Sequence, residues 1–360
     1  MSRTVGVEEE MFLVDPPTLR TRDVSERVVR AARESDDPAP DEVTQELFLA
    51  QLETNVEPSR TLAGLREHLV RARRRAARAA ETADVALLAS ATAIGPPPRV
   101  VTPTDRYQAM ARLHPDVPER AAVCAMHVHV EVVDEAEAVR VVDALAPWLP
   151  VVTALAAGSP FSEGRDTGYA TWRGRCWDRW PSAGPTEPFG DAAGYHRAVD
   201  ALVASGAVLD DAMVYLDARP GREVPTVEVR VTDVLTEVDD AVGVAALVRA
   251  LVSWAARDPA PPRHRVDVLR AGRWLAQRHG LGHRLLDPRT ARAVPARDAV
   301  AVLLDAVRPD LEEADDLPTV HDAVERLLDE GGPAGRARTV AAGDPVRWAR
   351  HVLEHTVPAP

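Results

Sequence analysis

Apolar and polar residues alternate with a period of two in several segments of the chain, as in β-strands that have one buried face. These segments are residues 4–15, 123–134 and 224–234, and another strand is expected over 208–217. Apolar residues that recur every three or four positions instead predict helices. The longest such pattern, rich in Ala and Arg, opens at Thr61 and covers 61–93. Further helices are predicted over 135–158 in two stretches, 191–206, 239–257, 262–279, 297–307, 317–329 and 344–355.

The order of these elements indicates the fold class. Strands and helices do not alternate as they do in βαβ units, and the last third of the chain is mostly helical. Such an order is typical of an α+β fold with a largely antiparallel sheet. Residues 159–190, which are dense in Gly, Pro, Trp and Arg, are expected to form a loop.

Charge narrows the range of partners. The 360 residues include 43 basic and 56 acidic side chains, which gives a formal net charge of −13. Nucleic acid is therefore not expected as the main partner, because a protein must present a basic surface to neutralise its phosphates. All 43 basic residues are arginine, which excludes the lysine of a Walker A loop and that of a Schiff base. A nucleotide stays compatible, since a metal ion can mediate between carboxylates and phosphates.

Cysteine content and hydropathy bear on the compartment. Cys124 and Cys176 cannot build a disulfide framework, and no apolar signal segment follows Met1. A cytoplasmic protein is expected, with both cysteines structural. Residues 144–162 carry no charge, but three prolines interrupt them, so we expect a buried helix and a loop there rather than a membrane span.

The first predicted strand carries two carboxylates on one face. Glu8 and Glu10 point the same way, about 7 Å apart, while Val5, Val7 and Met11 occupy the other face. Two inward-facing carboxylates require a cation or a basic partner. A solvated strand face is the alternative, and the apolar opposite face favours an inward-facing site.

Glu46 and Glu53 form a second pair of carboxylates, seven residues apart. This spacing places them on one face of a helix, whereas a strand would need a bulge or a bend to bring them together. By themselves they are interpreted as surface carboxylates.

Histidines occupy one face of the predicted strand at 123–134. His127 and His129 share that face with Glu131, and valines occupy the other. Two imidazoles at this spacing can approach one metal ion, although a pair of hydrogen-bonded core histidines is the alternative. In the strand at 224–234, Glu228 and Arg230 likewise share a face, either as an ion pair or as part of a site for metal and polyphosphate.

Two arginine-rich segments complete the set of candidates. The five arginines between Arg71 and Arg78 are interpreted as a solvated helix face rather than a phosphate-binding patch. The loop at 159–190 combines arginines with three tryptophans, so it could bind a substrate or simply pack as an irregular loop.

Together, these motifs resemble the glutamate–cysteine ligase type 2 family, the carboxylate-amine ligases. The segments that carry the resemblance span most of the chain: Thr4-Val5-Gly6-Val7-Glu8-Glu9-Glu10 with Asp15-Pro16, Glu46 to Glu53, His127-Val128-His129-Val130, Gly164-Arg165-Asp166-Thr167-Gly168-Tyr169-Ala170, and Glu228-Val229-Arg230. The resemblance implies a glutamine-synthetase-like catalytic domain over residues 1–360, with a curved, mainly antiparallel six-stranded sheet that forms a funnel and helices outside it.

The resemblance also implies a reaction and a set of roles. The enzyme would use ATP to join the γ-carboxylate of glutamate to an amine such as that of cysteine, through an acyl phosphate. Arg230 would act at the γ-phosphate, and His129, Arg173 and Tyr169 are candidates for binding substrate or nucleotide. Two or three Mg²⁺ ions would be held by the side chains of Glu8, Glu10, Glu46, Glu53, His127 and Glu228. Small molecules are the expected partners, with no membrane, and family analogy suggests a homodimer.

Glu131 departs from the family pattern, which usually has a small Gly after His-Val-His-Val. On the face of His127 and His129 it would either add a metal ligand or crowd the site with negative charge. Two other functions stay open at this point. One is a zinc-dependent hydrolase built on His127 and His129, and the other is a non-catalytic homologue of the ligases that binds nucleotide.

Overall fold

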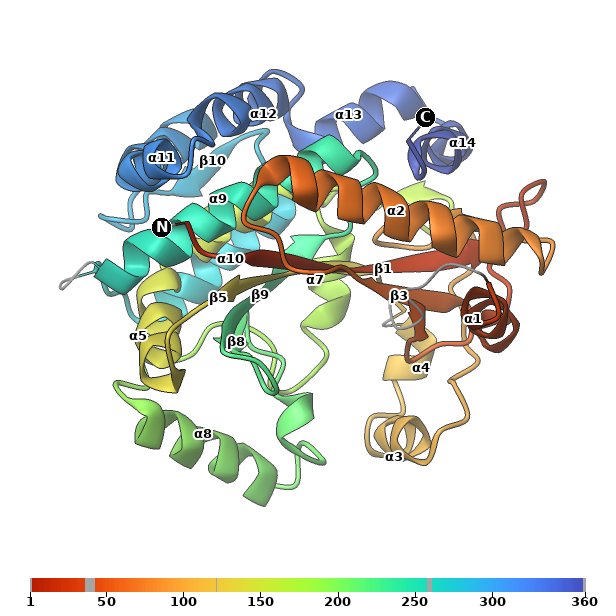
Figure 1. Ribbon diagram of the computed structural model, residues 1–360, viewed down its shortest axis with the longest axis horizontal. Coiled ribbons are helices and arrows are strands. Elements are labelled where there is room, and N and C mark those ends of the chain that lie inside the picture. Colours follow the sequence, from red (N-terminus) through yellow and green to blue (C-terminus); the bar gives the residue numbers. More distant parts are fainter. Residues whose placement is uncertain (1, 36–42, 121, 258–260, 359–360) are drawn as a thin grey trace.

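The computed structural model describes residues 2–35, 43–120, 122–257 and 261–358. An open sheet crosses the molecule, and most of the long helices lie on one side of it (Figure 1). The sheet strands are β1 (Val5–Val14), β2 (Val43–Gln45), β3 (Gln51–Asn55), β4 (Ala86–Leu88), β5 (Ala125–Glu131), β8 (Ala218–Pro220) and β9 (Thr226–Asp233). Two small hairpins pair β6 (Phe161–Ser162) with β7 (Arg165–Asp166) and β10 (Arg284–Leu286) with β11 (Ala293–Pro295).

The helices follow the chain in this order: α1 (Ser25–Arg33), α2 (Leu62–Glu81), α3 (Asp105–Leu113), α4 (Val117–Arg120), α5 (Glu135–Leu145), α6 (Leu149–Leu155), α7 (Trp172–Trp177), α8 (Ala192–Ala204), the 3₁₀ turn η2 (Asp211–Met213), α9 (Val238–Arg257), α10 (Val266–His279), α11 (Ala296–Glu313), α12 (Leu317–Asp329), α13 (Gly332–Ala341) and α14 (Pro345–His355). In Figure 1, α2, α9 and α11 to α14 lie above the sheet, and α3 and α8 lie below it.

The main sheet confirms the α+β expectation. Six strands follow one another in the order β2-β3-β1-β5-β9-β8, and β4 adds a seventh by pairing with the end of β1. Every pairing in this sheet is antiparallel. Strand β1 is central because β3 covers one of its edges while β5 and then β4 cover the other.

The two faces of β1 have different environments, as its alternation predicts. Val5, Val7 and Met11 are buried, and α2 and α9 pack on this strand. The long amphipathic α2 begins where Thr61 accepts a hydrogen bond from the amide of Gly64, as expected of a helix N-cap. The opposite face of β1 is thereby left for the polar side chains.

Several elements differ from the sequence-based expectations. Helix α2 ends at Glu81 rather than continuing to residue 93, because Asp84 adopts a left-handed conformation (φ 56°) that turns the chain into β4. Residues 208–217 contain η2 rather than a strand, and the strand β8 follows them. The sequence does not predict helices α1, α3, α4 and α13, nor α7, which lies within the expected loop at 159–190.

The prediction that the arginines of α2 form a solvated face is wrong for two of them. Arg73 and Arg75 are buried. The Arg73 guanidinium contacts Glu9, with Nε and Nη2 donating to its carboxylate over 2.8 and 2.6 Å. The remaining Arg73 N–H groups donate to backbone carbonyls, so Arg73 uses all five of its donors in joining β1 to other segments.

The uncharged segment 144–162 forms α6 and a loop, as expected. Within the part of the chain that the structure describes, no single helix is long and apolar enough to cross a membrane. Helices α5 and α6 reach that length and apolarity only when taken together, and they are bent by 73° at the break between them. Every residue of α6 is buried in the protein.

Candidate active site

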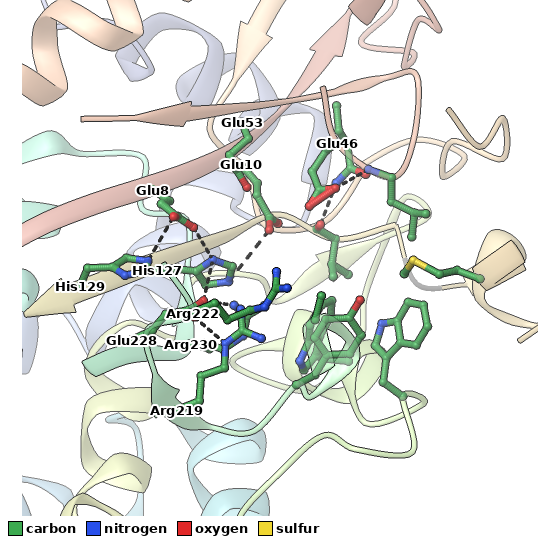
Figure 2. Close-up of a pocket in the computed structure, with 18 of the residues that line it drawn as sticks. Glu8, Glu10, Glu46, Glu53, His127, His129, Arg219, Arg222, Glu228 and Arg230 are labelled. Carbon is green, nitrogen blue, oxygen red and sulfur yellow. Dashed lines mark hydrogen bonds and ion pairs between the residues drawn. The ribbon is translucent and has the colours of Figure 1, made fainter. Parts of the chain in front are cut away.

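Strand register places the candidate residues in one row across the sheet. In the antiparallel pairing, Glu10 lies opposite Glu53 of β3, and Glu8 lies opposite His127 of β5. His129 in turn lies opposite Glu228 of β9. Directly opposed residues in an antiparallel pair have neighbouring side chains on the same face. The sheet therefore brings motifs that are far apart in the sequence together on one polar surface (Figure 2).

Two groups of potential metal ligands result. Glu10, Glu46 and Glu53 each offer a carboxylate oxygen, and these oxygens lie within 4.8 Å of one another. Glu8, His129 and Glu228 form a second group within the same limit. Oxygen-rich groups of this kind suit a hard divalent cation.

His127 lies between the two groups. Its Nδ1 is 3.2 Å from Oε2 of Glu8 and 3.8 Å from Oε1 of Glu228, whereas its Nε2 faces Oε1 of Glu10 at 4.0 Å. The Nε2 atom is buried and has no hydrogen-bond partner among the described residues. A buried, unpaired imidazole nitrogen beside a carboxylate group fits a metal ligand, because it would otherwise carry a desolvation penalty.

Glu46 reaches its group from the connection between two strands. It follows β2 directly, and the paired register of Thr44 with Glu53 folds this segment back over β3. The helix that the seven-residue spacing allowed is absent from this described segment, and the bend of the hairpin brings the two carboxylates together instead. The interpretation of both as surface carboxylates is wrong, since they line a cavity of about 440 Å³.

Burial and mutual repulsion raise the pKa values in the first group. Burial, followed by the charge of Glu46, raises the pKa of Glu10 to about 8. Burial also raises the pKa of Glu46 and raises that of Glu53 well above its usual value. Three carboxylates that resist ionisation together require a positive charge among them to become anionic at neutral pH.

The pKa shifts have the opposite direction around Glu8. Burial opposes its ionisation, but hydrogen bonds from His127 and His129 leave the pKa of Glu8 lowered. Burial, followed by the charge of Arg230, lowers the pKa of His127 to about 3. The imidazole of His127 is therefore neutral at pH 7, which is the form that binds metals.

Two arginines face the carboxylates from the other side of the cavity (Figure 2). Arg219 Nε donates to Glu228 Oε2 over 2.6 Å, and Arg230 pairs with Oε1 of the same carboxylate. The guanidinium of Arg230 also lies over the rings of Tyr215 and Trp177, at 5.7 and 5.9 Å from their centroids. These contacts hold the Arg230 guanidinium at the wall of the cavity.

A β-bulge contributes to the position of Arg230. The register of β5 with β9 shifts between Met126 and Val128, whose partners are Thr232 and Val229. Arg230 and Val231 therefore lie together opposite one residue of β5. Bulges of this type re-aim side chains beside functional sites, and the alternation of β9 alone does not predict one.

Arg173 and Tyr169 lie outside the cavity lining. Arg173 is buried behind the site, where its Nη2 donates to the carbonyl of Arg230 over 3.0 Å. The ring of Tyr169 packs instead between the guanidinium groups of Arg175 and Arg278, at 5.8 and 5.5 Å. The structure thus brings His129 to the cavity but not these two other substrate candidates.

Glu131 neither joins the metal ligands nor crowds them. Its carboxylate accepts hydrogen bonds from the backbone N and the hydroxyl of Thr4, both at 3.0 Å, and lies 3.4 Å from Arg60. These hydrogen bonds lower the pKa of Glu131. Glu131 departs from the family pattern, but its negative charge is compensated by these local contacts at the end of β5.

Several lining residues were missed from the sequence. Besides Arg219, the cavity is lined by residues from α3, from the segment between η2 and β8, and from the turn before β9, including Arg106, Tyr107, Tyr215 and Arg222. The hydroxyl of Tyr107 donates to Glu46 over 3.4 Å. None of these residues belongs to an alternating strand pattern with other polar residues, so only their position in the fold marks them.

The sequence as a whole matches a known family model. Residues 4–343 match the model described as glutamate–cysteine ligase family 2. The chain belongs to this family. A family member from Streptomyces avermitilis, provisionally named glutamate–cysteine ligase 2-1, is 45% identical over 92% of both chains. Another from Salinispora arenicola is 42% identical and covers 100% of this chain and 96% of its own.

Solved structures with the same fold are more distant in sequence. The glutamate–cysteine ligase of Francisella tularensis, solved with AMP, has a fold similar to that of this chain. Its TM-score is 0.71 at 11% identity, over 100% of this chain and 90% of the other. A bifunctional glutathione synthetase from Pasteurella multocida gives a TM-score of 0.75 at 14% identity, over 99% of this chain and 52% of that one. The sheet and its helices are therefore those of known ligases.

The family assignment leaves the two alternative functions without support. A zinc hydrolase would be expected to rely on imidazoles, but glutamates outnumber histidines in the two groups of ligands. The one sequence feature that favoured a non-catalytic homologue, Glu131, lies apart from the site.

Proposed function

We propose that the protein is an ATP-dependent carboxylate–amine ligase that joins the γ-carboxylate of glutamate to the amine of cysteine or a similar amine. The observation that carries the proposal is a row of four glutamates and two histidines across four strands, joined by Glu46 from the connection between β2 and β3 and faced by Arg219 and Arg230 in one cavity. Membership of the glutamate–cysteine ligase family supports the same reaction.

The five glutamates and two histidines fit a pair of Mg²⁺ ions. Glu10, Glu46 and Glu53 would hold one ion, with His127 Nε2 beside them, and Glu8, His129 and Glu228 would hold the other. When bound, such ions neutralise the phosphates of ATP and orient them for transfer. The raised pKa values of the first group support this assignment, because a divalent cation allows all three carboxylates to ionise.

The arginines supply the remaining positive charge. In the proposed reaction the carboxylate of glutamate attacks the γ-phosphorus of ATP, and ADP leaves. The amine then attacks the acyl carbon, forms the C–N bond and releases phosphate. In this proposal Arg230 stabilises negative charge on the transferred phosphoryl group, as arginines do in other phosphoryl transfers. Arg173 acts as a positioning residue through its bond to the Arg230 carbonyl.

We further propose that residues 1–360 form one catalytic domain and that the enzyme works in the cytoplasm, as a homodimer by family analogy. Neither nucleic acid nor a membrane has a role in this proposal. The free, buried state of Cys124 and Cys176 is compatible with a reducing compartment.

The decisive experiment measures phosphate release from ATP with Mg²⁺, glutamate and a panel of amines that includes cysteine. Release that depends on both glutamate and an amine would support the proposal and name the acceptor. Binding of ATP without phosphate release from any combination would contradict it.

A variant of Arg230 sharpens this experiment. Arg230→Ala should lower kcat by about 10³-fold or more, the range seen when a transition-state arginine is removed. The variant should still bind Mg²⁺, because Arg230 contributes no metal ligand. A rate within about tenfold of the unaltered protein would remove Arg230 from the proposed mechanism.

A further inference from the structure

A third group of ligand-type side chains lies outside the active site. Glu237, His351 and His355 each present one potential ligand atom, and these atoms lie within 4.8 Å of one another. Glu237 directly precedes α9, and the two histidines lie one turn apart near the end of α14. Figure 1 shows α14 on the helical side of the sheet, whereas the cavity is lined by Glu8 and Glu10 from the other face of β1.

The two histidines lie close together on one face of α14. Residues at i and i+4 of a helix are neighbours on one face, and the two rings stack with centroids 3.9 Å apart. Nδ1 of His355 lies 2.8 Å from the carbonyl oxygen of His351. Because a carbonyl oxygen only accepts hydrogen bonds, Nδ1 carries the proton in this contact. That bond leaves Nε2 of His355 with its lone pair, as in metal-binding histidines whose other nitrogen donates to a carbonyl.

The third ligand faces the same point from another element. Nε2 of His351 is 3.7 Å from Oε1 of Glu237. This nitrogen is buried and has no hydrogen-bond partner among the residues that the structure describes.

The surrounding framework keeps these two segments together. Arg73 Nη1 donates both to the carbonyl of Thr236 over 2.7 Å and to that of Thr356 over 3.0 Å. Glu237 and His355 are the chain neighbours of these two residues. Because Arg73 is itself fully buried against Glu9, the ligands are attached to a rigid part of the fold.

We propose that Glu237, His351 and His355 form a binding site for a borderline divalent metal ion of the Zn²⁺ class, which links α14 to the start of α9. Two imidazoles and one carboxylate are a ligand set that zinc uses, with water as the fourth ligand. Zinc would draw the three atoms to about 3.3 Å from one another, the spacing of tetrahedral ligands at zinc–nitrogen distances. Small side-chain rotations achieve this, since His355 is exposed and Glu237 is only partly buried. The site is independent of the proposed ligase chemistry.

The test uses the full chain in excess Mg²⁺, so that the carboxylates of the active site are occupied by the harder ion. Equilibrium dialysis against Zn²⁺ measures the number of ions bound, and substitution with Co²⁺ reports the coordination through its visible absorption. We expect one equivalent of Zn²⁺ to bind and to raise the melting temperature.

Substitutions locate this ion. His355→Ala and His351→Gln should each weaken Zn²⁺ binding at least about tenfold, because losing a ligand costs no less than losing one of its hydrogen-bond partners. His321→Ala, which removes an exposed histidine of α12, is the matched control and should bind Zn²⁺ as the unaltered protein does. Ligase activity in Mg²⁺ should be unchanged in His355→Ala.

Two results would overturn the proposal. One is the absence of Zn²⁺ binding by the unaltered protein once Mg²⁺ is in excess. The other is equal Zn²⁺ affinity in His355→Ala, His351→Gln and the unaltered protein, which would place the ion elsewhere. In that second case, loss of Zn²⁺ binding in His129→Ala would assign the ion to the active site instead.

Discussion

Glu8, Glu9 and Glu10 are identical side chains in a row, and β1 places them in three different environments. Glu9 points to the helical face and is fully buried against Arg73. Glu8 accepts hydrogen bonds from histidines that lower its pKa, whereas burial and a neighbouring carboxylate raise the pKa of Glu10. Alternation along a strand explains the division between faces, but the difference between Glu8 and Glu10 arises from their cross-strand partners.

Glu53 provides the sharpest test at the scale of a single residue. Glu53→Gln keeps the shape of the side chain and removes one carboxylate from the group that Glu53 forms with Glu10 and Glu46. We expect kcat to fall by about 100-fold or more, since a bound cation supplies much of the electrostatic stabilisation of the transition state in phosphoryl transfer. The melting temperature without metal should stay the same or rise, because a repulsive carboxylate has been removed.

Glu131→Gln is the matched control for this variant. Glu131 also lies on the sheet, yet its carboxylate contacts Thr4 and Arg60 rather than the cavity. The kcat of Glu131→Gln should therefore stay close to that of the unaltered enzyme. Equal losses in Glu53→Gln and Glu131→Gln would contradict the separation of these two residues, and phosphate release measures both.

At the scale of elements, α2 is more than a cover for the sheet. Arg73 projects from this helix, pairs with Glu9 of β1 and donates to the carbonyls of Leu235, Thr236 and Thr356. One side chain thus joins α2, β1, the start of α9 and the end of α14. An alanine- and arginine-rich helix gives no indication in its sequence of which arginine is buried.

Arg73→Met should therefore destabilise the fold strongly. Removing one partner of a buried ion pair leaves an unpaired charge and costs about 3–5 kcal/mol. The double variant Arg73→Met with Glu9→Met should recover part of this loss, since no charge stays buried. Urea unfolding measures both free energies. A loss below about 1 kcal/mol in the single variant would show that Glu9 finds another partner.

At the scale of the whole molecule, the charge of the cavity couples stability to metal and pH. The pKa of Glu10 is raised from 4.5 to about 8, so the folded protein holds a proton that the unfolded chain releases above pH 4.5. Stability contributed by this proton is present below pH 4.5 and is lost as the pH rises to 8. Glu46 and Glu53 shift in the same direction. A bound cation takes the place of the protons and thereby prevents this loss of stability at high pH.

Mg²⁺ should therefore raise the melting temperature more at about pH 8.5 than at about pH 6. At the lower pH the ion must displace protons from these carboxylates, so its net effect is smaller. Thermal unfolding with and without Mg²⁺ at the two pH values provides the measurement, and Glu53→Gln should show a smaller difference. An effect of Mg²⁺ that is equal at both pH values would contradict the assignment of the ion to this group.

Much of the site was accessible from the sequence because strand alternation is a local property. The faces of Glu8 and Glu10, of His127 and His129, and of Glu228 and Arg230 follow from a period of two. The positions of Glu46, Arg219 and Tyr107 do not, because they depend on a hairpin bend, a three-residue strand and a helix that approaches from elsewhere.

The sequence by itself determined the α+β class, the absence of lysine chemistry, the main strands and the family-type motifs. The tertiary structure alone decided which motifs meet. Strand register sets Glu10 against Glu53 and His129 against Glu228, and it depends on packing between segments far apart in the chain. It also decided which charges are buried, as with Arg73 and Glu9. Burial and pairing are properties of the surroundings of a side chain, and those surroundings exist only once the chain has folded.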